Sequence, residues 1–177
     1  MKKAVIICLT VMAFAVPLAK ASKHGHVSPY AGEETREIKS LSAEDIAELR
    51  RGGGWGLAKA AELNGVPGPA HLLESKDRIP LSPEQVSAIQ AILDQMREAA
   101  IEEGERLVER ERSLDENFRN RTVSDASLQR MLAGIEESRR ALRYIHLAAH
   151  LTASPLLTVE QIQSYNALQG YNTGSRK

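Results

Sequence analysis

Apolar residues recur at intervals of seven along the second half of the chain, and this spacing predicts long helices. The first series consists of Val86, Leu93, Ala100, Leu107 and Leu114. Ile89 and Met96 occupy the complementary positions, which gives the a/d pattern of a helix that packs along a partner helix. Farther along, Glu103, Arg110 and Asn117 take these positions, so the predicted seam becomes partly polar toward its far end.

A second series of apolar residues at the same interval predicts a return helix. Its members are Leu128, Ile135, Leu142, Ala149 and Leu156. The polar segment 120–122 separates the two series and predicts the bend between them. Two seams of matching length that are joined by a short bend predict an antiparallel helical hairpin.

Three short phrases predict where helices begin. They are Leu41-Ser-Ala-Glu-Asp45, Leu81-Ser-Pro-Glu-Gln85 and Leu157-Thr-Val-Glu-Gln161. In the last two phrases Ser82 and Thr158 are the N-cap residues, and Gln85 and Gln161 three positions later can close a capping box. The leucine that opens each phrase precedes the cap and can pack on the first helical turn as a hydrophobic staple.

The first half of the chain has a different organisation from the hairpin. Residues 22–40 are polar, show no sustained period and predict a flexible arm. Residues 41–79 predict short helices around a glycine-rich elbow, because each Gly inside a helix costs about 1 kcal/mol relative to Ala. Residues 80–170 form the predicted hairpin domain with its C-terminal capping helix, and 171–177 form a tail. The whole pattern predicts an all-α fold.

Residues 1–21 have the features of a cleaved secretory signal peptide. Two lysines precede an apolar segment, 4–16, which is too short to span a membrane, and Ala19-Lys-Ala21 supplies the small residues of a cleavage site. The chain contains a single cysteine, Cys8, which lies in this segment. We therefore expect an exported protein that has no disulfide and is held together by packing alone.

Charge and composition argue against several classes of function. The full chain has 23 basic and 23 acidic residues, and cleavage of the signal peptide removes three lysines, which leaves 20 basic residues. A slightly acidic chain lacks the basic surface that is typical of nucleic-acid binding. The exported chain has no cysteine nucleophile and no GxSxG motif, and its carboxylates lie on predicted helix faces, so we expect no enzymatic activity.

Two LTxxQ-like phrases, 81–85 and 157–161, bracket the predicted hairpin behind an export signal. In this combination the chain resembles the Spy/CpxP family of bacterial periplasmic proteins over roughly residues 80–170. The resemblance implies a periplasmic all-helical protein, often a cradle-like homodimer, that acts as an ATP-independent chaperone or envelope-stress protein. Its partners would be unfolded or misfolded proteins, together with a membrane-bound sensor. The same family includes heavy-metal sensors and zinc-resistance proteins, which implies a metal-binding alternative.

The chain has five histidines, and the first candidate metal site is at the new N-terminus. Cleavage after Ala21 leaves Ser-Lys-His, in which the amine, two amides and the His24 ring can bind Cu(II) or Ni(II) in a square of nitrogens. His26 is close enough to assist. The alternative is a polar arm whose histidines bind nothing.

The second candidate metal site is a pair of histidines on the return helix. His146 and His150 are four positions apart, so they share a helix face and can bind one ion such as Zn(II). A third ligand would come from Glu137, Glu160 or a second subunit. The alternative is that both histidines flank a packed seam and bind no metal. Separately, we expect His71 to stand alone on a helix surface.

We predict a chaperone that holds apolar client segments weakly and releases them without ATP. Ile101 and Val108 interrupt a charged helix face seven positions apart, and Leu147 lies on a second face of the return helix, so these three are the expected client contacts. Such a protein requires no cofactor. The rival function is a sensor or buffer of Cu, Ni or Zn, and a third alternative is a structural adaptor whose hairpin dimerises.

Overall fold

The computed structural model of the chain describes residues 27–171 and divides into two compact units, 1–31 and 32–177. All helices of the described residues belong to the second unit. The prediction of an all-α fold is confirmed, because the described residues form helices and contain no strand. The predicted signal peptide, His24 and His26 lie outside the described residues.

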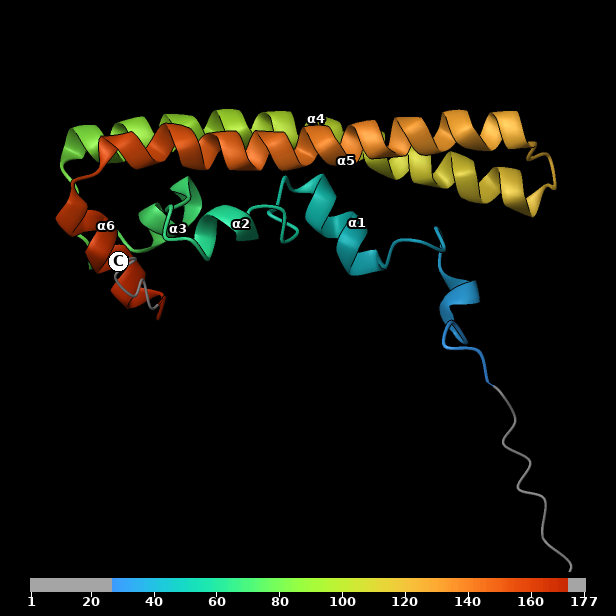
Figure 1. The fold of residues 1–177 in the computed structure, drawn as a ribbon, viewed down its shortest axis with the longest axis horizontal. Helices are drawn as coiled ribbons and strands as arrows, with labels where there is room; N and C mark the ends of the chain where they lie inside the picture. Colours follow the sequence, from blue (N-terminus) through green and yellow to red (C-terminus); the bar gives the residue numbers. More distant parts are fainter. Residues whose placement is uncertain (1–26, 172–177) are drawn as a thin grey trace, which may run out of the picture. The chain divides into compact units, whose positions relative to one another are not determined.

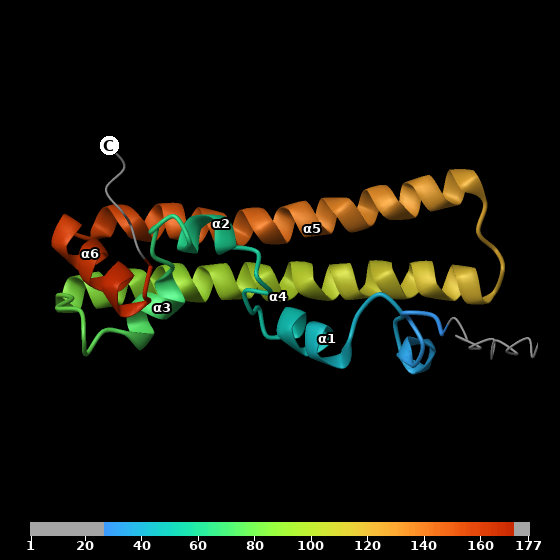
Figure 2. The ribbon, with the colours of Figure 1, turned by 60° about the horizontal axis from the view of Figure 1, so that its bottom comes forward.

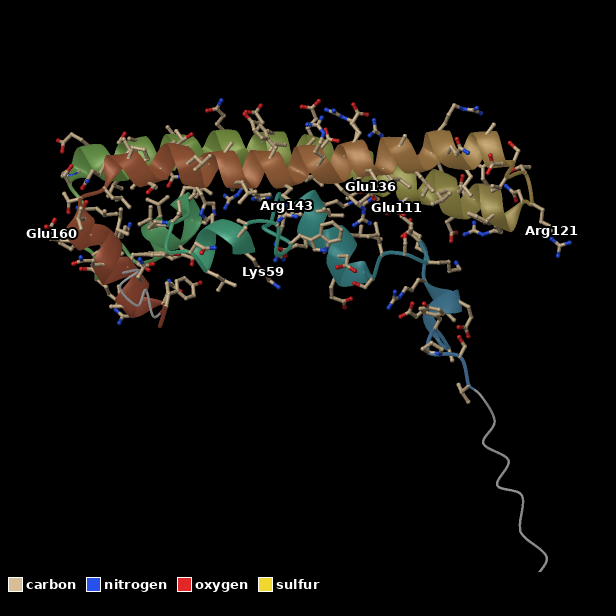
Figure 3. The ribbon with its side chains drawn as sticks, in the orientation of Figure 1. Lys59, Glu111, Arg121, Glu136, Arg143 and Glu160 are labelled. Atoms are coloured by element: carbon tan, nitrogen blue, oxygen red, sulfur yellow. The ribbon has the colours of Figure 1, made fainter. Side chains whose placement is uncertain are left out.

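The two long helices, α4 (Pro83–Arg119) and α5 (Asp125–Ala153), lie side by side and run in opposite directions (Figures 1 and 2). Asn120 caps the end of α4, and Ser124 is the N-cap of α5. Between them Arg121 adopts a left-handed backbone with φ of 56°, and its side chain points away from both helices (Figure 3). The chain therefore reverses within a short polar turn.

The shorter helices lie on one side of the α4–α5 pair, as Figure 1 shows. These helices are η1 (Glu33–Thr35), α1 (Ala43–Arg50), α2 (Lys59–Glu62), α3 (Pro69–Glu74), η2 (Ser154–Leu156) and α6 (Val159–Leu168). In Figure 2, α1 and α3 lie along α4 while α2 lies over α5. We call the side that carries α1–α3 and α6 the covered face and the opposite side the open face, on which the described residues place no further helix.

Two apolar cores attach the short helices to the covered face. The first core consists of Ile38, Leu41, Ile46, Leu49, Ala100, Leu107, Val108, Ile135 and Leu142. Within it Gly104 lets α1 approach α4 closely, because a Cβ at that position would lie 2.4 Å from the Leu49 carbonyl oxygen. The second core, near the start of α4 and end of α5, consists of Leu72, Ile79, Ile89, Ala153 and Tyr165.

All three helix-start phrases form capping boxes in the structure, and two of them contact each other. The Gln85 side chain accepts from the Ser82 N–H at 2.9 Å, and that of Gln161 accepts from the Thr158 N–H at 2.9 Å. Each amide also donates to the other's oxygen at 2.9 Å. Finally, Gln85 donates to the Leu156 carbonyl at 2.6 Å, and Gln161 donates to the Pro80 carbonyl at 2.8 Å. We call this arrangement the glutamine pair.

The polar positions of the predicted seam are satisfied by hydrogen bonds. Arg110 on α4 reaches across to α5, where it donates to the Gly134 carbonyl and, at 3.0 Å, to the Ser138 hydroxyl. Close by, the buried carboxylate of Glu111 accepts from Arg139 at 2.6 Å. Polar contacts thus replace apolar packing toward the turn.

None of the helices within residues 27–171 has the length and apolar character that crossing a membrane requires.

Candidate functional site

Three histidines, those of α3 and α5, line one pocket on the covered face. The pocket has a volume of about 160 Å³. Its lining includes His71, His146 and His150 together with Glu62 of α2, and its remaining wall comes from the glycine-rich segment 52–54, residues 58 and 68–70, and three side chains of α4. His71 is exposed on the surface of α3, as predicted. The prediction that it stands alone was wrong, because it shares this pocket with Glu62 and two other histidines.

Glycines allow the N-terminal segment to form this wall. Gly52 has φ of 66°, and a Cβ there would lie 2.8 Å from the Arg97 carbonyl oxygen of α4. Gly68, just before α3, has no room for a side chain, because its Cβ would lie 2.5 Å from Cε1 and 2.6 Å from Nε2 of His150. Both positions bring backbone against the hairpin more closely than any other residue type would permit.

Glu62 is the centre of the polar contacts in the pocket. Its Oε2 accepts a hydrogen bond of 2.6 Å from the buried Tyr165 hydroxyl of α6. Its Oε1 accepts from Nδ1 of His71 at 2.9 Å and lies 3.6 Å from Nε2 of His150. Groups from α2, α3, α5 and α6 therefore meet at one carboxylate.

The pocket shifts the pKa values of its ionisable groups. Burial acts to raise the pKa of Glu62, but hydrogen bonds from His71 and Tyr165 outweigh it and lower the pKa overall. The hydrogen bond to Glu62 raises the pKa of His71. Burial, and secondarily the proximity of His150, lower the pKa of His146. The pocket thus favours the ionised form of Glu62, the protonated form of His71 and the neutral form of His146.

His146 and His150 lie one turn apart on α5 and are 3% and 5% exposed. Nδ1 of His150 lies 2.8 Å from the Val66 carbonyl oxygen. Nε2 of His146 is buried and has no hydrogen-bond partner among the described residues. Such an unpartnered atom is unusual in a folded protein and destabilises it by about 1–3 kcal/mol.

The expected sources of a third ligand lie elsewhere. Glu137 pairs with Arg110 at 3.3 Å, and Glu160 is exposed in the first turn of α6 (Figure 3). Glu62 is the carboxylate that the fold brings to His150. Among the residues that the structure describes, no three His, Cys, Asp or Glu side chains are already placed to hold a metal ion.

The predicted client contacts have different environments. Val108 is completely buried in the first core, so the expectation that it contacts clients was wrong. Ile101 is 37% exposed and borders the Gly52 backbone on the covered face, and Leu147 is half-buried. None of these three residues lines the apolar groove of the open face.

That groove runs between α4 and α5 and has a volume of about 220 Å³. Its lining is Ile92, Gln95, Met96, Ala99, Ile145, Ala148, Ala149 and Thr152, and it includes no residue of α1–α3 or α6. Tyr144 and Leu151, each 69% exposed, follow the same stripe of α5 as Ala148 at helical spacing. The open face therefore combines a groove with exposed apolar side chains.

In comparisons with known proteins, no family model, no curated protein and no solved structure matches this chain.

Sequence reasoning did not find Glu62 or its contact with His71. The two residues are nine positions apart in the chain, and the segment between them contains the glycines and prolines that turn α3 back toward α2. A close contact at such a spacing has no local signature. The Glu62–Tyr165 contact joins residues 103 positions apart, so it requires the complete fold.

Proposed function

We propose that this protein is an exported, ATP-independent chaperone that binds apolar segments of unfolded proteins on the open face of its α4–α5 hairpin. The observation that carries the proposal is the groove between the two helices, which is apolar and left uncovered by the described residues. Monomeric proteins seldom expose continuous apolar surface without a binding role. In this proposal the residues that line the groove contact the client, in place of the predicted contacts Ile101, Val108 and Leu147.

The size of the groove suits weak and reversible binding. A volume of about 220 Å³ accommodates a few side chains of an extended client and does not enclose a folded domain. Burial of one Leu or Phe side chain contributes about 1.5–3 kcal/mol, whereas association costs about 4 kcal/mol or more. A client with one apolar residue is therefore not retained, while a segment with several is held until it folds.

Charged side chains border the apolar surface on both helices. Glu98 is exposed on α4 one turn after the groove residue Gln95, and Arg140 is exposed on α5 one turn before Tyr144. Charges of both signs keep the face soluble and can contact the polar residues that flank apolar segments of a client. Such a surface does not require one particular client sequence, which fits a broad range of clients.

The export, the homodimer and the membrane-bound sensor partner belong to the same proposal. Export rests on the signal-like pattern of 1–21, and the homodimer and sensor rest on the family resemblance over roughly 80–170. Sedimentation equilibrium of the processed protein tests the dimer, since it distinguishes the mass of one chain from that of two.

Light scattering from a reduced, aggregating α-lactalbumin tests the function. We expect the processed protein to suppress aggregation at stoichiometric amounts, and we expect the double substitution Tyr144→Glu with Leu151→Glu to abolish suppression. Leu63→Glu is the matched control, because Leu63 is 64% exposed but follows α2 on the covered face. Wild-type protein that leaves aggregation unchanged, or a control that loses suppression equally, contradicts the proposal.

A further inference from the structure

The ring of His150 has the tautomer of a metal ligand. The Val66 carbonyl can only accept, so Nδ1 of His150, 2.8 Å away, carries the proton of that contact. In the neutral ring the lone pair of Nε2 then faces Oε1 of Glu62 at 3.6 Å. A metal ion bound between Nε2 of the neutral ring and Oε1 of Glu62 would satisfy both atoms. A hydrogen bond from the second ring nitrogen to a backbone carbonyl is also what orients metal-binding histidines.

His146 supplies a second nitrogen on the same face of α5 that could bind a metal ion. Its Nε2 is buried without a hydrogen-bond partner among the described residues. Histidines four positions apart on one helix can bind a single ion. Together, His146 and His150 supply two nitrogen ligands directed toward the same pocket.

Glu62 is held as a ligating carboxylate would be. Tyr165 donates to Oε2 and His71 donates to Oε1, so the carboxylate is oriented by hydrogen bonds from two other elements. Ligands about 2.1 Å from a tetrahedral Zn²⁺ are about 3.4 Å apart, close to the 3.6 Å between Oε1 of Glu62 and Nε2 of His150. Gly68 leaves the space beside both atoms unfilled, because its Cβ would lie 2.6 Å from Nε2 and 3.0 Å from Oε1.

We propose that Glu62, His146 and His150 bind one divalent transition-metal ion of the Zn²⁺ class, with His71 and Tyr165 as positioning residues. Since no three such side chains of residues 27–171 already surround an ion, binding includes rotation of the His146 ring toward the other two. The ion would join α2 to α5 and so fix the glycine-rich segment to the hairpin. This site is separate from the groove and uses residues that the chaperone proposal does not.

Titration of the processed protein with ZnCl2, followed by calorimetry and by thermal unfolding, tests the site. The protein carries His24→Ala and His26→Ala, so that the candidate N-terminal site is removed. We expect one ion per chain, and a melting temperature that rises with zinc concentration. Glu62→Gln and His150→Ala should each weaken binding at least 100-fold and remove the rise. Glu74→Gln, an exposed carboxylate of α3, should leave both unchanged.

Visible absorption of the Co²⁺-loaded protein keeps the test independent of stability. A site with two imidazoles and one carboxylate predicts the intense bands of a tetrahedral ion, and Glu62→Gln should reduce them even if the variant melts at a lower temperature. Binding that appears only at millimolar metal overturns the proposal. It is also overturned if Glu62→Gln and His150→Ala bind zinc as tightly as the parent protein.

Discussion

The glutamine pair predicts a large and cooperative loss of stability when either side chain is shortened. In the Gln161→Ala variant, the side chain no longer accepts from the Thr158 N–H at 2.9 Å, donates to the Pro80 carbonyl at 2.8 Å or exchanges hydrogen bonds with Gln85 at 2.9 Å. Each such bond contributes about 1 kcal/mol net. Gln161 is only 7% exposed, so water does not readily replace it. The four bonds together predict a loss of about 4 kcal/mol.

Gln85→Ala should have a similar effect, because Gln85 bonds the Ser82 N–H, the Leu156 carbonyl and Gln161. Both hydrogen bonds of the reciprocal amide contact are lost in either single variant, so the double variant should be less destabilised than the sum by about 2 kcal/mol. Urea unfolding of the three variants and the wild type measures this coupling. Constant m-values would show that the folded and unfolded states keep their exposed surface.

Gln163→Ala is the control for this series, since Gln163 lies exposed on the same helix and should change stability by no more than about 0.5 kcal/mol. If Gln161→Ala costs no more than the control, or if the two glutamine variants are strictly additive, the two phrases act as separate helix caps. The reasoning about their mutual contact would then be refuted.

Three further predictions concern the packing of glycines and the pH dependence. Gly104→Ala should lower the melting temperature, because the new Cβ would lie 2.4 Å from the Leu49 carbonyl oxygen; a rise would contradict the close approach of α1. Gly134→Ala should raise the free energy of unfolding by up to about 1 kcal/mol, because the added Cβ would lie 3.6 Å from its nearest neighbour, the Arg110 side chain. A clear loss of stability would contradict that spacing. The hydrogen bond to Glu62 raises the pKa of His71. The stabilisation that this contact gives the folded state is therefore complete below the ordinary pKa of His and is lost as pH rises through the raised pKa. The stability difference between wild type and His71→Asn, measured by urea unfolding from pH 5 to 9, should therefore shrink with rising pH, and growth with pH would contradict the contact.

Sequence patterns predicted the helices well because helix capping and periodicity depend on residues that are close together in the chain. The capping boxes at Ser82 and Thr158 require only residues three positions apart, and they form as the phrases predict. The a/d spacing likewise reflects the face of α4 that meets α5. The contact between Gln85 and Gln161, however, spans 76 positions, and no periodicity within either helix indicates it.

The functional residues were harder to predict because burial depends on the short helices. Val108 interrupts a charged face in the sequence, yet α1 covers it, so an apparently exposed residue belongs to a core. His146 and His150 were candidates from their spacing alone, whereas Glu62 lies near His150 in a place where Gly68 leaves room for the close approach. Tertiary packing of the 41–79 segment therefore decides which apolar and polar side chains remain available.

Photo-crosslinking to an unfolded client tests the central claim, that the open face of the hairpin binds apolar segments. A benzophenone amino acid is placed at Gln95 or Thr152, which line the groove and are exposed, or at Ala47 or Ala60, which are exposed on α1 and α2. The account predicts adducts with reduced α-lactalbumin from the two groove positions and not from the other two. Adducts that form equally from Ala47 and Ala60, or none from the groove, would contradict it.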